Sequence, residues 1–313
     1  MIRLAIVLPC YNEEEVLGLT ARQLNKLFND LKNKHKVSDD SFALFVNDGS
    51  KDSTWDVICR LHEEYDFVKG LNLAHNVGHQ SAIWAGMMKV KDMCDAVVTI
   101  DADLQDDVKC IEKMVDNHAK GFDVVYGVKV QRKADSWLKR TSAEMFYKLQ
   151  KRMGVDMVYN HADFRFLSKR VVEALAKYPE RNLYLRGMIP QIGYPSTTVE
   201  DVLSERQAGQ SKYTLSKMIN LALDGITSFS TKPLYYVVYT GVIFIFISIL
   251  IAIYVLISLI NGTAVHGWAS LILSVWFVGG VILIALGSVG AYVGKIYREV
   301  KRRPIYNEQD FLD

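Results

Sequence analysis

The chain has 313 residues, of which 50% are hydrophobic and 23% are charged, and its formal net charge at pH 7 is +2. So small an excess of cations does not favour nucleic acid as a partner, because nucleic-acid-binding domains carry a marked excess of Lys and Arg. The charge is also unevenly distributed, since residues 233–294 contain no Lys, Arg, Asp or Glu. This change in composition divides the chain into a charged N-terminal part and an uncharged C-terminal part.

The N-terminus carries no recognisable signal peptide, because its only apolar stretch, residues 4–8, is too short and no cleavage pattern follows it. The four cysteines show neither CxxC pairing nor the spacing of a metal site. Unpaired cysteines are typical of a reducing compartment. We therefore expect the charged part to lie in the cytoplasm.

Short apolar runs alternate with amphipathic segments through the charged part. The runs predict strands at residues 4–8, 42–46, 68–73, 96–100 and 124–126. The segments between them predict helices at residues 16–31, 54–65, 80–91 and 108–120. This alternation favours an α/β fold with a mostly parallel sheet and helices on both faces. In such folds the residues that follow the carboxyl ends of the strands line the ligand crevice.

Polar residues follow the first two predicted strands. Residues Pro9–Glu14 come after the first, and residues Asn47–Ser53 come after the second. In the second segment Gly49 follows Asp48 and permits either a positive φ or close approach of another group. Taken alone, each segment is equally compatible with an ordinary turn that caps the next helix.

A denser acidic cluster follows the predicted strand at residues 96–100. Asp101, Asp103, Asp106 and Asp107 place four carboxylates within seven positions. Such crowding of like charges calls for a cation, and oxygen ligands favour Mg²⁺ or Mn²⁺ shared with substrate phosphates. Asp106 and Asp107 have a second interpretation, because acidic residues also favour the first turn of a helix.

Residues 129–152 contain eight Lys and Arg residues but only two acidic ones. A solvated helix face and attraction to anionic lipid headgroups both account for this segment; near a membrane surface each cation contributes about 1 kcal/mol. Further along, apolar residues of 212–229 fall on one helical face. This pattern predicts an amphipathic helix that lies in the membrane interface or packs on the charged part.

Two long apolar runs lie within the uncharged part, at residues 234–260 and 268–293. Each exceeds the roughly 20 residues that a helix needs to cross a bilayer. Lys232 precedes the first run, several cations follow the second, and the seven residues between the runs contain no Lys or Arg. The positive-inside rule then places both flanks in the cytoplasm. A pair of buried core helices is the alternative.

Six motifs occur in one order along the chain: Pro9–Glu14, Asp48–Ser53, Asn76–Gly78, Asp101–Gln105, Asp163–Arg165 and Arg206–Tyr213. In these motifs and their order the chain resembles the family 2 inverting glycosyltransferases of the GT-A fold. Within that family it is most similar to the polyisoprenyl-phosphate sugar transferases, which include dolichol-phosphate mannose synthases and bactoprenol glucosyltransferases. The resemblance runs from Arg3 to Arg303, and the two-helix tail favours the bactoprenol branch. The chain departs at His79, where relatives often carry Lys, and at Ala162, where many carry Gly.

The resemblance assigns expected donor-side roles to residues of these motifs. It implies that the nucleoside is held by Pro9, Tyr11, Glu13 and Asp48. It implies that Asp101 contacts the nucleotide, while Asp103 and Gln105 hold a divalent metal, Mg²⁺ or Mn²⁺. Arg206 and Lys212 would grip the donor diphosphate, a role that suits a guanidinium fork and a point charge.

The resemblance also marks two residues as catalytic, Asp103 beside the metal and Asp163 as the base. A phosphate monoester with a second pKa near 6 is already largely ionised at pH 7. Asp163 therefore either abstracts a proton or orients the reactants, and the sequence leaves both roles open. Relatives bind the acceptor phosphate through Arg in the basic segment, which points to Arg132 and Arg140.

The resemblance implies a Rossmann-like GT-A domain attached to a membrane. The expected parts are a transferase domain at 1–210, a juxtamembrane amphipathic helix at 211–232, two transmembrane helices within 233–294 and a basic cytoplasmic tail at 295–313. We expect a multi-pass protein of the cell membrane with both termini in the cytoplasm. A homo-oligomer is also expected, with no nucleic acid partner.

The expected reaction is transfer of glucose from UDP-glucose to polyprenyl (undecaprenyl) phosphate, with inversion, at the cytoplasmic membrane face. Mannose from GDP-mannose, N-acetylglucosamine and aminoarabinose are alternative sugars, because the sequence does not determine the donor. A non-enzymatic membrane scaffold is the rival interpretation. It accounts for the apolar helices but does not explain the acidic cluster.

Overall fold

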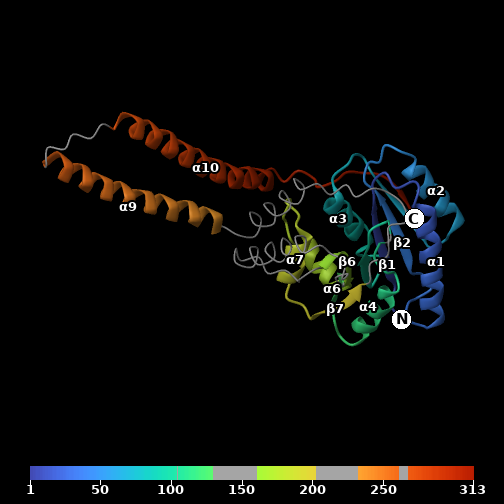
Figure 1. The fold of residues 1–313 in the computed structure, drawn as a ribbon. Coiled ribbons are helices and arrows are strands. Elements are labelled where there is room, and N and C mark those ends of the chain that lie inside the picture. The colour runs from blue at the N-terminus through green and yellow to red at the C-terminus, as the bar shows by residue number, and fades with distance from the viewer. Residues whose placement is uncertain (104, 130–160, 202–231, 261–266) are drawn as a thin grey trace.

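The computed structural model describes residues 1–103, 105–129, 161–201, 232–260 and 267–313 (Figure 1). Within these residues, eight strands form one mixed sheet in the order β7-β5-β6-β4-β1-β2-β3-β8. The strands are β1 (Leu4–Cys10), β2 (Phe42–Asn47), β3 (Val68–Leu73), β4 (Ala96–Thr99), β5 (Val124–Lys129), β6 (His161–Ser168), β7 (Ser196–Asp201) and β8 (Glu308–Leu312). β6 and β8 run antiparallel to their neighbours, whereas the other pairings are parallel.

The helices of the α/β domain cover both faces of this sheet (Figure 1). They are α1 (Leu17–Asn33), α2 (Thr54–Glu64), α3 (His79–Val90), α4 (Cys110–Ala119), α6 (Lys169–Ala176) and α7 (Leu185–Gln191). Successive side chains of a strand point to opposite faces. In β1, Leu4 and Ile6 accordingly pack in one core with α1, α2 and α4, while Ala5 and Val7 pack in the other with α3, α6 and α7. The expected α/β architecture is confirmed.

Each strand and helix that the sequence predicts before residue 130 is present, with ends shifted by a few residues. The elements between residues 161 and 201 are additional to the strands and helices that the sequence predicts. β6 lies between β4 and β5 and runs against both. The mostly parallel sheet therefore contains an antiparallel strand beside the acidic loop.

The C-terminal residues differ from the expected basic tail at 295–313. The preceding helix continues to Lys301, and β8 then pairs antiparallel with β3 at the sheet edge. Phe311 packs against the core that contains α3, and Lys89 of α3 lies 2.6 Å from the Glu308 carboxylate. An exposed edge strand invites pairing with other chains, and β8 covers this one.

Two long helices follow the α/β domain and project away from it as a hairpin (Figure 1). They are α9 (Lys232–Ile260) and α10 (Trp268–Lys301), and the rings of Phe244 and Phe277 lie 5.3 Å apart between them. Large apolar side chains on both helices are exposed, among them Phe246 at 62% and Leu283 at 70%. Within the described residues, one segment of 25 residues, Phe277–Lys301, is long and apolar enough to cross a membrane.

Candidate active site

The register of the strands brings the predicted substrate-binding and catalytic residues to one edge of the sheet. Cys10 at the end of β1 lies opposite Asn47 at the end of β2, and Val7 lies opposite Thr99 at the end of β4. Because β6 is antiparallel to β4, its first residues reach the same edge, with Thr99 opposite Arg165. The edge therefore carries the motifs Pro9–Glu14, Asp48–Ser53 and Asp101–Gln105 together with Asp163.

Asp48 organises the loop that precedes α3. One of its carboxylate oxygens accepts the Val77 N–H at 2.7 Å, and the other accepts the Gly78 N–H and the Asn76 Nδ2 group, each at 3.0 Å. Burial raises the pKa of Asp48 above its usual value, although these hydrogen bonds oppose the rise. Asp48 therefore fixes the turn at residues 76–78 beside the end of β2.

Gly49 allows that close approach. Its φ is +59°, and a Cβ atom built at this position would lie 2.5 Å from the Asn76 backbone nitrogen. A side chain is thus excluded both by backbone conformation and by space. The glycine that the sequence marks after Asp48 has the function expected of it.

The first motif is tied to the second by hydrogen bonds. The Glu13 N–H donates to Thr54 Oγ1 at 2.9 Å, and the Lys51 N–H donates to Asn12 Oδ1 at 2.9 Å. Pro9 lies in the buried strand β1, whereas the Tyr11 side chain is 38% exposed at the loop. Tyr11 is therefore accessible to a ligand at the sheet edge.

The acidic loop that follows β4 brings the Asp101, Asp103 and Asp106 carboxylates close together. Within the described residues, Asp101 Oδ1 is buried without a hydrogen-bond partner. Burial raises the pKa of Asp101 to about 6, and the nearby Asp163, Asp106 and Asp103 carboxylates add to the rise against the opposing effect of His79. Such a site favours the arrival of a cation.

The donor set fits a divalent cation that is shared with a substrate. Asp103 and Gln105 lie on the same turn, where the Gln105 N–H donates to Asp103 Oδ1 at 3.3 Å. In the part of the chain that is described, no group of three or more His, Cys, Asp or Glu side chains forms a closed metal site. Mg²⁺ bound with substrate phosphates needs only one or two protein carboxylates. The residues present therefore fit the expected metal.

Asp106 and Asp107 contact residues of α4, β5 and β7. The Asp107 N–H donates to Asp201 Oδ1 at 2.9 Å, and Asp107 Oδ1 accepts the Lys109 N–H just before α4. Lys129 Nζ lies 3.1 Å from Asp106 Oδ1. These contacts anchor the loop to α4, β5 and β7, which agrees with the interpretation that separates Asp106 and Asp107 from the metal.

Asp163 is the centre of a buried ionic cluster. Its Oδ1 accepts Arg165 Nη2 at 2.6 Å and Arg186 Nε at 3.3 Å, while its Oδ2 accepts Arg186 Nη2 at 3.0 Å. His79 Nε2 lies 3.3 Å from Oδ2 and 3.5 Å from Asp101 Oδ1. Burial alone would raise the pKa of Asp163, but Arg186, His79 and Arg165 hold it well below the usual range.

His79 connects the Asp101 and Asp163 carboxylates, which lie at the same edge of the sheet. Burial lowers its pKa, but the Asp163 hydrogen bond and the charges of Asp101 and Asp163 outweigh that effect and raise it. The sequence marks His79 only as a departure from the family. Its position in the cluster depends on the turn that Asp48 fixes, and spacing along the chain does not reveal it.

Arg186 is the site residue that sequence reasoning misses. It lies in α7, and its only signal is a single cation within the otherwise apolar run Leu183–Ile189. The four cations expected at the donor diphosphate and the acceptor phosphate, Arg206, Lys212, Arg132 and Arg140, lie outside the described residues.

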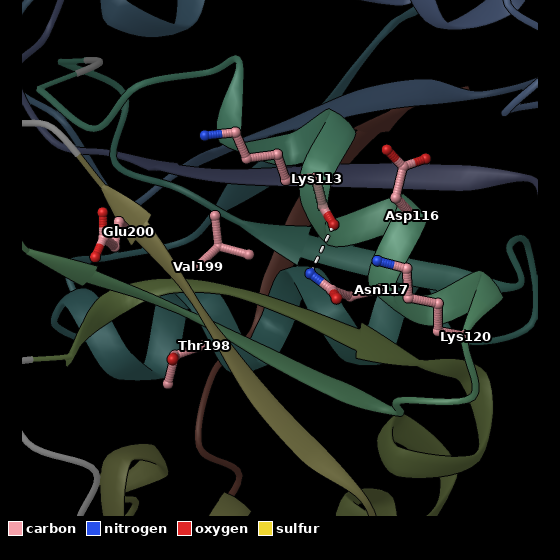
Figure 2. Close-up of a pocket in the computed structure, with 7 residues that line it drawn as sticks. All are labelled: Lys113, Asp116, Asn117, Lys120, Thr198, Val199 and Glu200. Carbon is pink, nitrogen blue, oxygen red and sulfur yellow. Dashed lines mark hydrogen bonds between the residues drawn. The ribbon is translucent and has the colours of Figure 1, made fainter.

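A separate surface pocket lies between α4 and β7 (Figure 2). Its lining residues are Lys113, Asp116, Asn117, Lys120, Thr198, Val199 and Glu200. None of the predicted site residues belongs to this lining. The predicted site residues in the described part of the chain therefore lie at the strand ends and not in this pocket.

Comparison with known proteins gives consistent results. Residues 5–176 match the model of glycosyl transferase family 2. An uncharacterized glycosyltransferase, YkoT of Bacillus subtilis (strain 168), is 46% identical across 98% of this chain and 93% of its own length. The SfII prophage-derived bactoprenol glucosyl transferase of Shigella flexneri is 39% identical, with 97% of each chain covered. The crystal structure of a mycobacterial protein shares the fold at a TM-score of 0.50 and 13% identity, covering 72% of this chain and 73% of its own.

Proposed function

We propose that this chain, which belongs to glycosyl transferase family 2 and is therefore a glycosyltransferase, transfers glucose from UDP-glucose to a polyprenyl phosphate. Similarity to proteins named bactoprenol glucosyl transferase, at 39% identity over nearly the whole chain, supports a glucosyl donor and a lipid-phosphate acceptor. Mannose, N-acetylglucosamine and aminoarabinose remain alternatives for the sugar, and the experiment below distinguishes them.

The observation that carries the proposal is the position of the ionic site beside an exposed apolar hairpin. The Glu299 carboxylate near the end of α10 accepts the backbone N–H groups of Arg181 and Asn182, at 2.8 Å and 2.7 Å. These residues lead directly into α7, whose Arg186 contacts Asp163. A helix with the length and composition of a membrane span thus ends against the segment that borders the site. This arrangement suits an acceptor that stays in the membrane.

On the donor side, we assign the nucleoside to Pro9, Tyr11, Glu13 and Asp48. Asp101 would contact the nucleotide, with Asp103 and Gln105 as ligands of Mg²⁺ or Mn²⁺. When bound, the cation would neutralise charge on the departing nucleoside diphosphate. Arg206 and Lys212 complete the proposed diphosphate site.

In the proposed reaction, an oxygen of the lipid phosphate attacks the anomeric carbon of glucose from the side opposite UDP. The new carbon–oxygen bond forms as the bond to the β-phosphate oxygen breaks, and UDP leaves with the electron pair. A phosphate monoester dianion becomes a diester monoanion, and UDP carries the remaining negative charge away. The dianion needs no deprotonation, since its second pKa is near 6.

This chemistry favours an orienting role for Asp163. Its carboxylate is engaged by Arg165, Arg186 and His79, and its pKa lies well below the usual range. A general base works best when its pKa is near the operating pH. Asp163 therefore serves the reaction by holding cationic groups in place.

For the membrane, we propose two spans, residues 234–260 and 268–293, with the α/β domain and both termini in the cytoplasm. The exposed apolar side chains of α9 and α10 support insertion of both helices into a membrane, because contiguous apolar surface of this extent is unusual in water. Arg298 and Lys301 follow the second span on the expected cytoplasmic side.

The test is to incubate membranes containing the protein with polyprenyl phosphate and a panel of labelled nucleotide sugars. Label from UDP-glucose should enter the lipid fraction, and chemical analysis should identify a glucosyl phosphodiester. If label enters the lipid from a different nucleotide sugar, that sugar, and not glucose, is the one that the protein transfers. Label that enters only a soluble acceptor would refute the lipid proposal.

A further inference from the structure

The two arginines that contact Asp163 differ in their exposure to solvent. Arg165 is fully buried, whereas the Arg186 side chain is 21% exposed. Asp163 engages the Nε and Nη2 atoms of Arg186, so the planar guanidinium is held in one orientation by two parallel contacts. A guanidinium held in this way is suited to bind a second anion.

The helix that carries Arg186 is fixed from two directions. The Leu185 N–H donates to Gln80 Oε1 at 2.9 Å, which ties α7 to α3 next to His79. On the other side, the Glu299 carboxylate accepts the Arg181 and Asn182 N–H groups. α7 consequently lies on the side of the α/β domain from which the hairpin α9–α10 projects (Figure 1).

The position of Arg186 separates it from Asp48, which is proposed to hold the nucleoside. Asp48 and the turn at residues 76–78 lie at the ends of β2 and β3, whereas Arg186 approaches Asp163 from α7 at the start of β6. The site also holds Asp101, Asp103 and Asp163, which repel a phosphate dianion that arrives from the membrane. A cation is needed on that side to offset the repulsion.

We propose that Arg186 binds the phosphate group of the lipid acceptor and that Asp163 is the positioning residue that orients it. This inference rests on the proposed function and adds a residue to the acceptor side. His79, which is 44% exposed, lies between Asp101 and Asp163 and keeps the two carboxylates together. Arg165 contributes the buried charge that fixes Asp163 itself.

The experiment compares Arg186→Gln and Arg186→Lys with the unchanged full-length protein in detergent or proteoliposomes. Initial rates are measured against polyprenyl phosphate at saturating donor, and UDP binding with Mn²⁺ is measured by titration calorimetry. Arg186→Gln should raise the KM for the acceptor at least about tenfold, the loss expected for one charge-assisted contact. Its UDP affinity should stay within about twofold, and Arg186→Lys should recover part of the acceptor affinity.

Arg170→Gln is the matched control. Arg170 also pairs with a buried carboxylate, Asp123, but it lies on α6 and is 55% exposed. This variant should leave the KM for the acceptor unchanged. If Arg186→Gln loses UDP binding as well, the Arg186→Lys variant decides: a raised acceptor KM with normal UDP binding supports the proposal, and an unchanged KM overturns it.

A short-chain prenyl phosphate distinguishes recognition of the phosphate from recognition of the lipid chain. The increase in KM should persist with the short acceptor, because the guanidinium contacts the phosphate. An effect confined to the long-chain acceptor, or a fall in kcat with unchanged KM, would overturn the proposal. If the unchanged protein transfers no sugar to either lipid, the proposed function fails and not merely the assignment of Arg186.

Discussion

Arg165 Nη2 lies 2.6 Å from Asp163 Oδ1, and both side chains are almost completely removed from solvent. Removing one partner of a buried ion pair leaves the other charge uncompensated, which costs about 3–5 kcal/mol. Asp163 is thus required for the stability of the site as well as for its geometry. The two contributions can be separated by experiment.

Asp163→Asn should lower turnover steeply at every pH between 6.5 and 8.5. Loss of the carboxylate charge releases Arg186 and leaves Arg165 buried without a counter-ion. The melting temperature should also fall by several degrees. Measurement of kcat across this pH range, alongside thermal unfolding, checks both effects; near-normal turnover at pH 8 would remove Asp163 from the mechanism.

Gly49→Ala should weaken nucleotide binding. The new Cβ would lie 2.5 Å from the Asn76 backbone nitrogen at a φ of +59°, so the turn that Asp48 holds must move. Titration with UDP and Mn²⁺ measures the loss. Gly121→Ala is the control, because Gly121 also has a positive φ, +98°, but nothing within 4 Å of an added Cβ. It should lower stability by about 1 kcal/mol and leave UDP affinity intact; equal losses of affinity in both variants would contradict the steric explanation.

Asp201→Asn should stabilise the protein at pH 8 but not at pH 5. Burial and the neighbouring Asp106 raise the pKa of Asp201 to about 7, with Lys129 opposing them. A carboxyl with a raised pKa favours the folded state when protonated, and that contribution is lost as pH rises from about 4 through 7. Asparagine keeps the oxygen that accepts the Asp107 N–H and carries no charge. Melting temperatures of both proteins between pH 5 and 8 should diverge as pH rises; parallel curves would contradict the prediction.

The sequence predicts the first half of the sheet well because each strand there is a short apolar run followed by a polar loop. Leu4–Cys10 and Ala96–Thr99 are strands of this kind, and their buried residues leave little ambiguity. β8 escapes prediction because Glu308–Leu312 is largely polar and becomes a strand only by pairing with β3. Its position depends on tertiary contact rather than on local pattern.

The same distinction applies to the site. Asp48, Asp101 and Asp163 are found from strand ends and from motifs, since parallel strands bring their carboxyl ends together. Arg186 is not found in that way, because it reaches Asp163 from a helix 23 residues further along the chain. The local signal for Arg186 is that it is a cation within an apolar run. Its role becomes clear only from the structure, which places it against the buried Asp163 carboxylate.

Removal of β8 by ending the chain at Arg303 should lower both stability and nucleotide affinity. The β3 edge would be exposed, and Asn72 would lose Asp310, whose carboxylate accepts its Nδ2 group at 3.2 Å. Asn72 in turn accepts the Asn47 Nδ2 group at 2.8 Å, directly before Asp48. The truncation therefore removes one of two consecutive hydrogen bonds that connect β8 to Asn47, next to the proposed nucleoside residue Asp48.

Glu308→Gln is the control for this truncation, because it removes only the partly exposed ion pair with Lys89, for which at most about 1 kcal/mol is expected. That variant should bind UDP normally. A fragment that ends at Lys212 also lacks β8, so we expect its nucleotide binding to be weakened for the same reason, independently of the membrane helices. Thermal unfolding and UDP titration of the three proteins provide the comparison. Normal UDP affinity in the chain that ends at Arg303 would show that β8 protects the sheet edge without supporting the site.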